Sequence, residues 1–472
     1  MKNYKCIVIG SGPGGATTAL EFVKKGIDVL LLEKGSNTPL NKLQEYTSTE
    51  MNQKYKNSGL TASMGNHLIN YAEGSCLGGG SEVNSGLYHE IPEMILEKWE
   101  EKNKIKFDRN ELKESYEYVK NILDISYMPE NLIPDASKRL KHGSDKFGWQ
   151  CSEIPRWYSY KSDPLGKRMS ISETLIPEFL QNGGELLESC NVIKVKKGRK
   201  NKNIVQVMNA NGERFDLQAE FLVIAGGSID TPNLLLKSGY RHNIGKGLKM
   251  HPSFKFTALF DEKINNKNMG VPVHQVKEFS PQISMGCSIS SKQFIALGLN
   301  DTSNIAHLDS WECMANYYSM ICPQGSGSIH RIPFFKSPLV LFNLSKTDRE
   351  NIIKGAKLLG QILFSAGAKK LFPSISKEII FENEDDLEHL NNINFKNFNL
   401  MTIHLFSSAQ IGGDRRISAT NEIGQLWGDK SIVISDGSLL CDSPSVNPQA
   451  TIMAIAKMNS KKLIEVVKKN ET

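Results

Sequence analysis

The stretch CIVIGSGPGGATTAL, residues 6–20, decides the fold of this 472-residue chain. An apolar strand runs directly into three glycines and then into a helix, which is the order of a dinucleotide-binding βαβ unit. In such a unit Gly10 permits the tight turn, Gly12 lets the backbone approach a pyrophosphate, and Gly15 lets the helix pack close to the strand. The next apolar strand ends at Glu33, whose carboxylate can accept hydrogen bonds from ribose hydroxyls. The sequence therefore predicts a Rossmann-like nucleotide-binding unit.

A second informative stretch, IVISDGSLLCDSPSVNPQATIMAIAKMNSKKL, occupies residues 432–463. It predicts a strand, an Asp-Gly turn and a Ser/Pro/Asn segment that opens a helix. The pattern places Asn447 at the N-cap of that helix and Pro448 at its first position. The positive end of the helix would then stabilise a negative charge on a bound ligand by about 1 kcal/mol. A simple capped helix without a ligand is the alternative.

Composition is ordinary for a globular protein, with 39% hydrophobic and 23% charged residues in a length that suits two or three domains. The net charge of +6 comes mostly from scattered lysines. The densest basic run, KKGRKNKN at residues 196–203, lies between two strand-like segments. We interpret it as a solvated hairpin turn, so no nucleic-acid partner is expected.

The eight cysteines show no Cys-x-x-Cys motif and no paired histidine spacing, so we expect no metal site. The first strand starts within five residues of Met1, which leaves no room for a signal peptide. No apolar run approaches the ~20 residues that span a bilayer, so no transmembrane segment is expected. These features favour a reduced, cytoplasmic protein.

Four blocks in a fixed order resemble the glucose-methanol-choline (GMC) oxidoreductases, flavoenzymes that oxidise alcohols. The blocks are the N-terminal fingerprint, CLGGGSEVN (76–84), AGGSIDTPNLLLKSG (225–239) and the segment 432–463, with a weaker fifth around Arg168 and Ser170. The resemblance implies an α/β fold: a Rossmann-like FAD-binding domain with an inserted α+β substrate-binding domain built on an antiparallel sheet. It also implies an FAD-dependent alcohol oxidase or dehydrogenase.

The domain organisation expected from these blocks is discontinuous. Residues 1–95, 185–252 and 396–472 would form the FAD-binding domain, and residues 96–184 a connecting and partly substrate-side segment. Residues 253–395 carry no nucleotide signal and would form the substrate-binding domain.

Two helix starts can be predicted locally. Thr231 would cap the helix of the third block with Pro232 at its first position, and Thr347 with Glu350 would form a capping box further along.

The resemblance also implies a set of FAD-binding residues. Glycine-loop residues and Glu33 would hold the ADP half, the second block would pass beside the isoalloxazine and ribityl chain, Val192 would offer backbone groups to the adenine, and Asp436 would meet the ribityl or pyrophosphate region. The full predicted set is Gly10, Ser11, Gly12, Gly15, Glu33, Leu77, Gly79, Gly80, Ser81, Asn84, Val192, Asp436, Asn447, Pro448 and Gln449. Some relatives attach the flavin through a histidine in the second block. Val83 stands at that position here, so we expect non-covalent FAD.

His404 and Asn447 are the predicted catalytic residues, because the family pairs a histidine with a histidine or asparagine at a similar separation. Alcohol oxidation needs a base for the hydroxyl proton while hydride leaves to the flavin N5, and a neutral imidazole suits that role. Asn447 can donate a hydrogen bond to the developing alkoxide. His251 also matches a family position, and we expect a structural role for it. The stretch after His404, residues 407–411, departs from the family pattern.

The substrate is the least readable feature. A helix predicted over residues 347–368 resembles that of family members that act on apolar, long-chain or cyclic alcohols, and this resemblance implies such a substrate. We expect Phe279, Met285 and Trp311 on the face that covers the flavin. The segment 311–320 could line an apolar pocket, although core packing is the commoner role of such a segment. The electron acceptor, oxygen or another, is not readable. Three alternatives stay open: another flavoprotein class such as a hydroxylase, a light-dependent GMC relative, and a catalytically silent flavin-binding protein.

Overall fold

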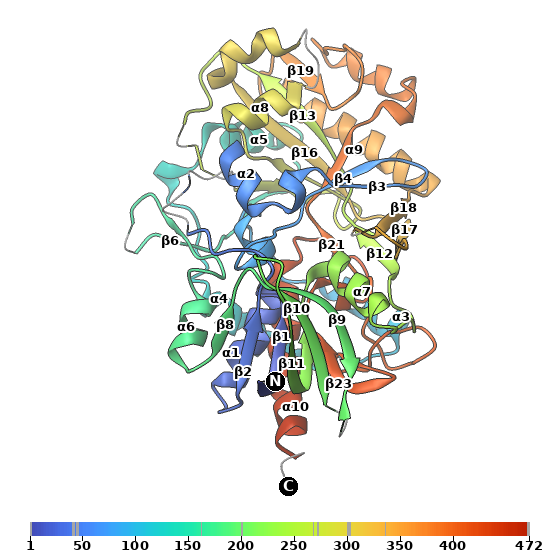
Figure 1. Cartoon of the computed structure of the whole chain (residues 1–472). Helices are drawn as coiled ribbons and strands as arrows, with labels where there is room; N and C mark the ends of the chain where they lie inside the picture. The colour runs from blue at the N-terminus through green and yellow to red at the C-terminus, as the bar shows by residue number, and fades with distance from the viewer. Residues whose placement is uncertain are drawn as a thin grey trace.

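The computed structural model describes residues 2–39, 43, 47–161, 163–199, 202–267, 269–270, 273–299, 304–335 and 337–469. Figure 1 shows two stacked parts, each built on its own sheet: β1, β11 and α10 lie in the lower part, and β13, β16 and α9 in the upper part. Elements from both ends of the sequence lie side by side in the lower part. The fold is therefore a Rossmann-like domain joined to a second domain that is built on a mostly antiparallel sheet, as predicted.

The lower part is an eight-stranded sheet in the order β22-β23-β11-β1-β2-β8, with β10 and β9 added beside β11. Its strands are β1 (Asn3–Ile9), β2 (Val29–Leu32), β8 (Glu185–Leu187), β9 (Asn191–Lys197), β10 (Asn203–Met208), β11 (Arg214–Ile224), β22 (Gln425–Leu426) and β23 (Asp429–Ile434). The central pairs, β11 with β1, β1 with β2, β2 with β8 and β11 with β23, are parallel. The β-branched run of β1 is buried on both faces, as a central parallel strand requires.

Helices of this part bury the sheet and shape its ligand edge. They are α1 (Pro13–Val23), α3 (Glu93–Asn103), α4 (Arg109–Ile122), α6 (Leu175–Gln181), α7 (Gly227–Lys237) and α10 (Gln449–Lys469). α1 packs between α10 and α6, so the first and last helices of the described chain share one core. β9 and β10 form the predicted hairpin, although the centre of its turn, Lys200 and Asn201, lies outside the described residues.

The upper part is a nine-stranded, mostly antiparallel sheet in the order β3-β4-β20-β13-β16-β15-β14-β5, with β19 beside β13. Its strands are β3 (Ala62–Ser63), β4 (Ile69–Tyr71), β5 (Cys151–Glu153), β13 (Ser253–Leu259), β14 (His274–Val276), β15 (Ile283–Cys287), β16 (Met314–Ile321), β19 (Lys370–Pro373) and β20 (Leu400–Thr402). The sheet thus takes strands from outside residues 253–395 as well. A two-stranded sheet joins β6 (Tyr158–Ser159) and β7 (Lys167–Arg168).

One face of the upper sheet is a hydrophobic core. Phe254, Phe256 and Ala258 alternate along β13 with polar residues and are fully buried. They pack under α5 (Asp135–Asp145) and α9 (Lys346–Ser365). The helix α8 (Lys292–Leu299) contacts β13 and β16 on the opposite face of the sheet. The sheet is therefore two-sided: the face toward α5 and α9 is apolar, and the other face carries polar side chains beside the apolar contacts with α8.

Three side chains expected on the flavin-covering face lie elsewhere, so that prediction is wrong. Met285 is fully buried in the core under α5 and α9. Phe279 packs edge-on against Trp149 and lies in the same core region. Trp311 belongs to a 3-10 segment that packs with α8. Strand alternation shows which residues share a face, but not what that face meets.

Local capping also differs from the predictions. α9 is capped by Ser345 and Asp348 in a capping box, two residues earlier than predicted, because Ser345 is the residue with extended backbone before the first turn. α7 already begins at Gly227, so Pro232 lies inside it. Thr231 does not cap this helix start, because it lies within the helix as well.

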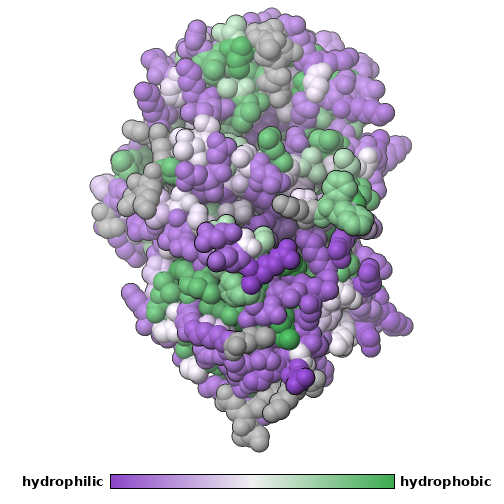
Figure 2. Space-filling model, in the orientation of Figure 1, coloured by the Kyte–Doolittle hydropathy of each residue, from purple (hydrophilic) through white to green (hydrophobic). Residues whose placement is uncertain are grey.

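A four-stranded sheet connects the two parts in the order β18-β17-β12-β21. Its strands are β12 (Lys246–Met250), β17 (Ser326–His330), β18 (Leu339–Asn343) and β21 (Leu405–Phe406). Figure 2 shows a mainly hydrophilic face, on which hydrophobic residues gather at the level of β3, β17 and β18. Phe334, after β17, is fully exposed. No helix within the described ranges is long and apolar enough to cross a membrane.

Candidate functional site

The glycine loop after β1 has the geometry of a phosphate-binding turn. Gly10 has φ +103, and a Cβ there would lie 2.2 Å from the carbonyl oxygen of Ala225. A Cβ on Gly12 would meet nothing within 4 Å, so the loop faces open space at the start of α1. The first-turn N–H groups of α1 have no side-chain cap. Such a helix end is suited to an anion such as a pyrophosphate.

Glu33 holds this loop from the end of β2. Its carboxylate accepts from the Ser11 N–H at 3.0 Å, from the Ser11 hydroxyl at 2.6 Å and from the Gly35 N–H at 2.8 Å. Burial raises the pKa of Glu33, while the three donors oppose that effect. The predicted ribose-binding carboxylate is therefore also a structural anchor of the loop.

The second sequence block forms a tight segment that crosses the glycine loop. A Cβ on Gly79 would lie 2.9 Å from the Cα of Gly12, so only a glycine allows this approach. The Gly78 N–H donates to the Ser11 hydroxyl at 3.0 Å. Buried Arg168 donates to the carbonyl oxygen of Ser81 at 2.8 Å, which explains the weak fifth block as a clamp on this segment.

A cavity of about 740 Å³ runs along the glycine loop, the second block and α7 to the predicted catalytic residues. The predicted residues that line it are Gly10, Gly12, Glu33, Gly79, Gly80, Asn84, Val192, His404, Asp436, Asn447, Pro448 and Gln449. The predicted residues outside its lining are Ser11, Gly15, Leu77 and Ser81. These four support the lining from behind, as Ser11 and Ser81 do through the bonds above. Val83 is in the lining as well.

Asp436 uses its carboxylate within the protein. It accepts from the N–H groups of Gly227 and Ser438, each at 2.8 Å, and from the hydroxyls of Thr231 and Ser438. Burial raises its pKa against these donors. Asp436 therefore fastens the start of α7 to the last block while it borders the cavity.

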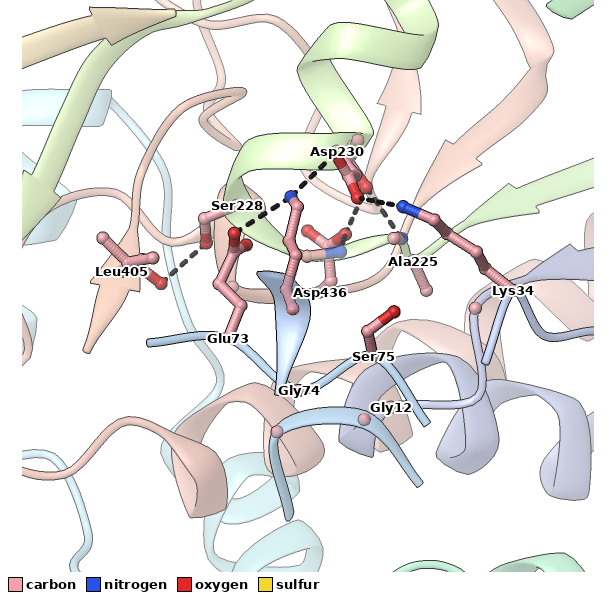
Figure 3. A pocket seen from close by; sticks show the side chains of 18 of the residues that line it. Gly12, Lys34, Glu73, Gly74, Ser75, Ala225, Ser228, Asp230, Leu405 and Asp436 are labelled. Atoms are coloured by element: carbon pink, nitrogen blue, oxygen red, sulfur yellow. Dashed lines mark hydrogen bonds and ion pairs between the residues drawn. The ribbon is translucent and has the colours of Figure 1, made fainter. Parts of the chain in front are cut away.

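A charged cluster borders the same cavity, and sequence reasoning missed it. Lys56 Nζ lies 3.0 Å from Glu73 and 2.9 Å from Asp230, and Lys34 Nζ lies 3.6 Å from Asp230. Figure 3 shows Lys34 reaching Asp230 on α7, while Glu73 and Asp230 lie on either side of the amine that pairs with both, above the segment of Gly74 and Ser75. Opposite charges within the cluster join four separate segments around the cavity, after β2, after α2, after β4 and in α7.

His404 and Asn447 meet at the far end of the cavity. The Asn447 side-chain amide nitrogen lies 3.3 Å from Nε2 of His404. The other ring nitrogen, Nδ1, lies 3.1 Å from Nδ1 of His251. Antiparallel pairing of β12 with β21 brings these two histidines together, because Met250 pairs with Leu405. His251 is therefore more than a distant structural residue, since it contacts the predicted base.

The hydrogen bonds fix one consistent set of tautomers. If the Asn447 amide donates to Nε2 of His404, that nitrogen carries a lone pair and Nδ1 carries the proton. His404 Nδ1–H then donates to Nδ1 of His251, and His251 Nε2–H donates to the Ser443 hydroxyl at 2.6 Å. The relay orients the His404 ring with its basic nitrogen at the cavity end.

Both rings are neutral at physiological pH. Desolvation lowers the pKa of His404 to about 4. Burial, with the neighbouring His404 and Lys277, lowers the pKa of His251 well below its ordinary value. A neutral His404 can accept a proton, whereas an imidazolium cannot.

Asn447 is not the N-cap of α10. The first backbone bond of the helix runs from the Ile452 N–H to the Pro448 carbonyl at 2.9 Å, so Pro448 holds the flanking position and Asn447 lies one residue outside. Its side chain is thereby available to His404. The Gln449 side chain accepts from Asn84 at 2.6 Å and joins the second block to the start of α10, which borders the cavity.

The altered stretch after His404 is structural. Ser407, Ala409 and Ile411 donate their backbone N–H groups to residues 437–439. The Ser408 hydroxyl donates to the Ser228 carbonyl at 2.6 Å. Residues 407–411 lie outside the lining of the cavity described above, so their departure from the family pattern changes packing behind His404.

The residues present fit FAD. Open space at Gly12 and Gly80, an uncapped helix end and Glu33 suit the ADP half, and the cavity continues past Val83 to His404. Within the described part of the chain, no cluster of three or more His, Cys, Asp or Glu side chains could hold a metal ion. All eight cysteines are free thiols.

Comparisons with known proteins agree with this geometry. The sequence matches the GMC oxidoreductase family over residues 51–253 and 335–456. It is 34% identical to an uncharacterized GMC-type oxidoreductase, y4nJ, of Sinorhizobium fredii, over 95% of this chain and 92% of the relative. It is 24% identical to the long-chain-alcohol oxidase FAO4B of Arabidopsis thaliana, over 97% of this chain and 67% of that protein.

Solved structures share the fold. Pyridoxine 4-oxidase from Mesorbium loti superposes with a TM-score of 0.74 at 14% identity, covering 98% of this chain and 99% of that one. Formate oxidase superposes with a TM-score of 0.76 at 13% identity, covering 99% of each chain. Together with the matched sequence blocks, these findings show that the chain belongs to the GMC oxidoreductase family and is an FAD-dependent oxidoreductase.

Proposed function

We propose that this protein oxidises the CH–OH group of an alcohol, with His404 as the base that takes the hydroxyl proton. The observation that carries the proposal is the neutral His404 ring, whose Nε2 lies 3.3 Å from the Asn447 amide at the end of the cavity. Bound FAD would accept the hydride from the carbinol carbon. Residues at the glycine loop, the second block and the start of α10 would hold it non-covalently.

Each protein group has a defined task in this proposal. His404 Nε2 receives the hydroxyl proton, and it can do so because the ring is neutral and this nitrogen carries a lone pair. Asn447 donates a hydrogen bond that can move from Nε2 to the alkoxide oxygen as negative charge develops there. His251 accepts from Nδ1 of His404 and supports the imidazolium that forms. Ser443 fixes the orientation of His251 in turn.

Family membership argues against the hydroxylase alternative. An apolar, long-chain or cyclic alcohol stays a prediction for the carbon skeleton, and the relatives named long-chain-alcohol oxidases favour it. They share only 24% identity with this chain, so the rest of the substrate is argued below from the protein's own side chains.

The test is anaerobic reduction of the bound flavin by a panel of alcohols, followed by admission of air. The wild type is expected to lose its oxidised flavin absorption with at least one alcohol, and His404→Ala to retain FAD but react ~10²–10⁴-fold more slowly. Rapid reoxidation in air would identify an oxidase. A protein that binds FAD but is reduced by no alcohol would support the light-dependent or silent alternative. Wild-type rates in His404→Ala would remove His404 from the reaction.

A further inference from the structure

The polar face of the upper sheet carries a continuous row of side chains. Lys255 pairs with Tyr318, Tyr318 with Gly286, and Gly286 with Gln275, so these positions share one face. A Cβ on Gly286 would lie 2.7 Å from the Tyr318 hydroxyl, which shows that the tyrosine lies across this glycine. Its hydroxyl accepts from the Gln275 amide at 2.7 Å. Lys277, two residues after Gln275, lies on the same side of the extended chain.

This face looks toward the reaction centre. The Gln275 side-chain oxygen lies 3.0 Å from Nε2 of His89, two residues after the cavity-lining Leu87. The charge of Lys277 contributes to lowering the pKa of both His89 and His251, so its ammonium is within electrostatic range of the histidine pair. α5 and α9 cover the opposite face. The row therefore extends from the predicted base across the sheet.

Lys255 and Lys277 have no anionic partner among the residues that the structure describes. Neither ammonium forms an ion pair or a hydrogen bond with these residues. Desolvation lowers the pKa of each to about 8, yet both side chains stay partly accessible. A desolvated cation without a counter-ion is unfavourable, so an anionic ligand would stabilise each of them.

One more buried polar atom on this side is unsatisfied. Nδ1 of His89 has no hydrogen-bond partner among the described residues, although the side chain is only 9% exposed. Its Nε2 is already used by Gln275. The far end of the polar face is closed, because a Cβ on Gly298 of α8 would lie 2.2 Å from the Thr257 hydroxyl. The unpartnered groups therefore gather between α8 and the histidine pair.

We infer that the alcohol oxidised here carries an anionic group, a carboxylate or a phosphate, which Lys255 and Lys277 bind with the help of Tyr318. This inference rests on the proposed function and names the substrate class of the same site. The phosphates of FAD are assigned to the glycine loop in the lower part, so they do not need the two lysines of the upper part. An apolar skeleton remains compatible, because the anion binds at one end of the substrate and the hydroxyl reacts at the other.

The first experiment compares matched alcohols with the wild-type FAD-loaded enzyme. 1-Hexanol, 6-hydroxyhexanoate, 6-hydroxyhexyl phosphate and 6-aminohexan-1-ol differ at the end away from the hydroxyl. At least one anionic member is expected to reduce the flavin at a tenfold or more lower half-saturating concentration than 1-hexanol, and the cationic member is expected to be the poorest. The better of the two anions identifies carboxylate or phosphate.

The second experiment measures binding without turnover. Hexanoate, hexyl phosphate and hexanamide lack a reactive hydroxyl, and their binding is followed by calorimetry. An anion should bind at least tenfold tighter than the amide. Lys255→Met and Lys277→Met should each lower this discrimination roughly tenfold, and Lys→Arg at either position should retain most of it. Lys263→Met removes a lysine whose side chain is 75% exposed in the same part and should change nothing.

The outcomes separate the two claims. If alcohols reduce the flavin but 1-hexanol matches both anionic members, or if hexanamide binds as tightly as hexanoate and hexyl phosphate, the anionic substrate class is wrong and the proposed function stands. If an anion binds selectively but no alcohol reduces the flavin, the proposed function is wrong and the anion site stands. Because the wild-type comparisons decide both, a lysine variant that fails to fold does not remove the test.

Discussion

Replacing His251 by leucine tests whether the predicted base depends on its buried neighbour. The substitution removes the acceptor 3.1 Å from His404 Nδ1 and leaves a buried N–H without a partner. An unpaired buried donor costs about 1–3 kcal/mol. If that cost falls on the proton-transfer step, the flavin should be reduced roughly 5- to 150-fold more slowly, since 1.4 kcal/mol corresponds to tenfold.

The assay is anaerobic stopped-flow reduction at saturating alcohol, with FAD content measured for each variant. His251→Asn keeps an acceptor oxygen near the position of Nδ1 and should recover most of the rate. His274→Leu is the matched control: His274 is 7% exposed and bonds to the Ser137 hydroxyl at 2.9 Å, but it lies away from His404. Wild-type reduction in His251→Leu, or equal losses in His274→Leu, would refute the relay from His404 to His251.

Three further outcomes are expected. Because desolvation lowers the pKa of His404 to about 4, the rate of flavin reduction should be constant from neutral pH to about pH 6 and fall only as the pH drops through about 4. In stopped-flow profiles, a midpoint near pH 6.5 would contradict a neutral buried base. Asn447→Ala should slow reduction but change the free energy of unfolding by less than the ~1 kcal/mol of a lost cap, since Asn447 lies outside α10, and urea titration decides this. With Val83 at the position of the attachment histidine, acid precipitation should release all FAD into the supernatant, and yellow colour in the pellet would show a covalent bond.

The nucleotide-binding half of the fold was predictable because its signals are local. Gly10, Gly12 and Glu33 act within one βαβ unit, so their spacing in the sequence is already their spacing in space. His404 and Asn447 were found only through the resemblance to a family, because nothing local relates residues so far apart. The sequence did not identify His251 as a contact of His404, because only the pairing of β12 with β21 brings the two residues together.

The substrate side was less readable for a physical reason. The alternation of Phe254, Lys255 and Phe256 shows that β13 has two unlike faces, but the sequence does not say which face meets the flavin. Met285 was therefore placed on the wrong side. The ion pairs of Lys56 were missed for a similar reason, because Glu73 and Asp230 come from separate segments that only the tertiary fold brings together.

The position of β11 between β1 and β23 has a consequence for biosynthesis. β1 leaves the ribosome well before β11, and β23 and α10, which complete the sheet and cover α1, follow more than four hundred residues after β1. At translation rates of about 5–20 residues per second, α1 waits on the order of half a minute or more for α10, and the edge of β11 that receives β23 waits on the order of ten seconds or more. Chaperones have the most to protect in this interval, and cofactor loading at the start of α10 can follow only after that helix has been made.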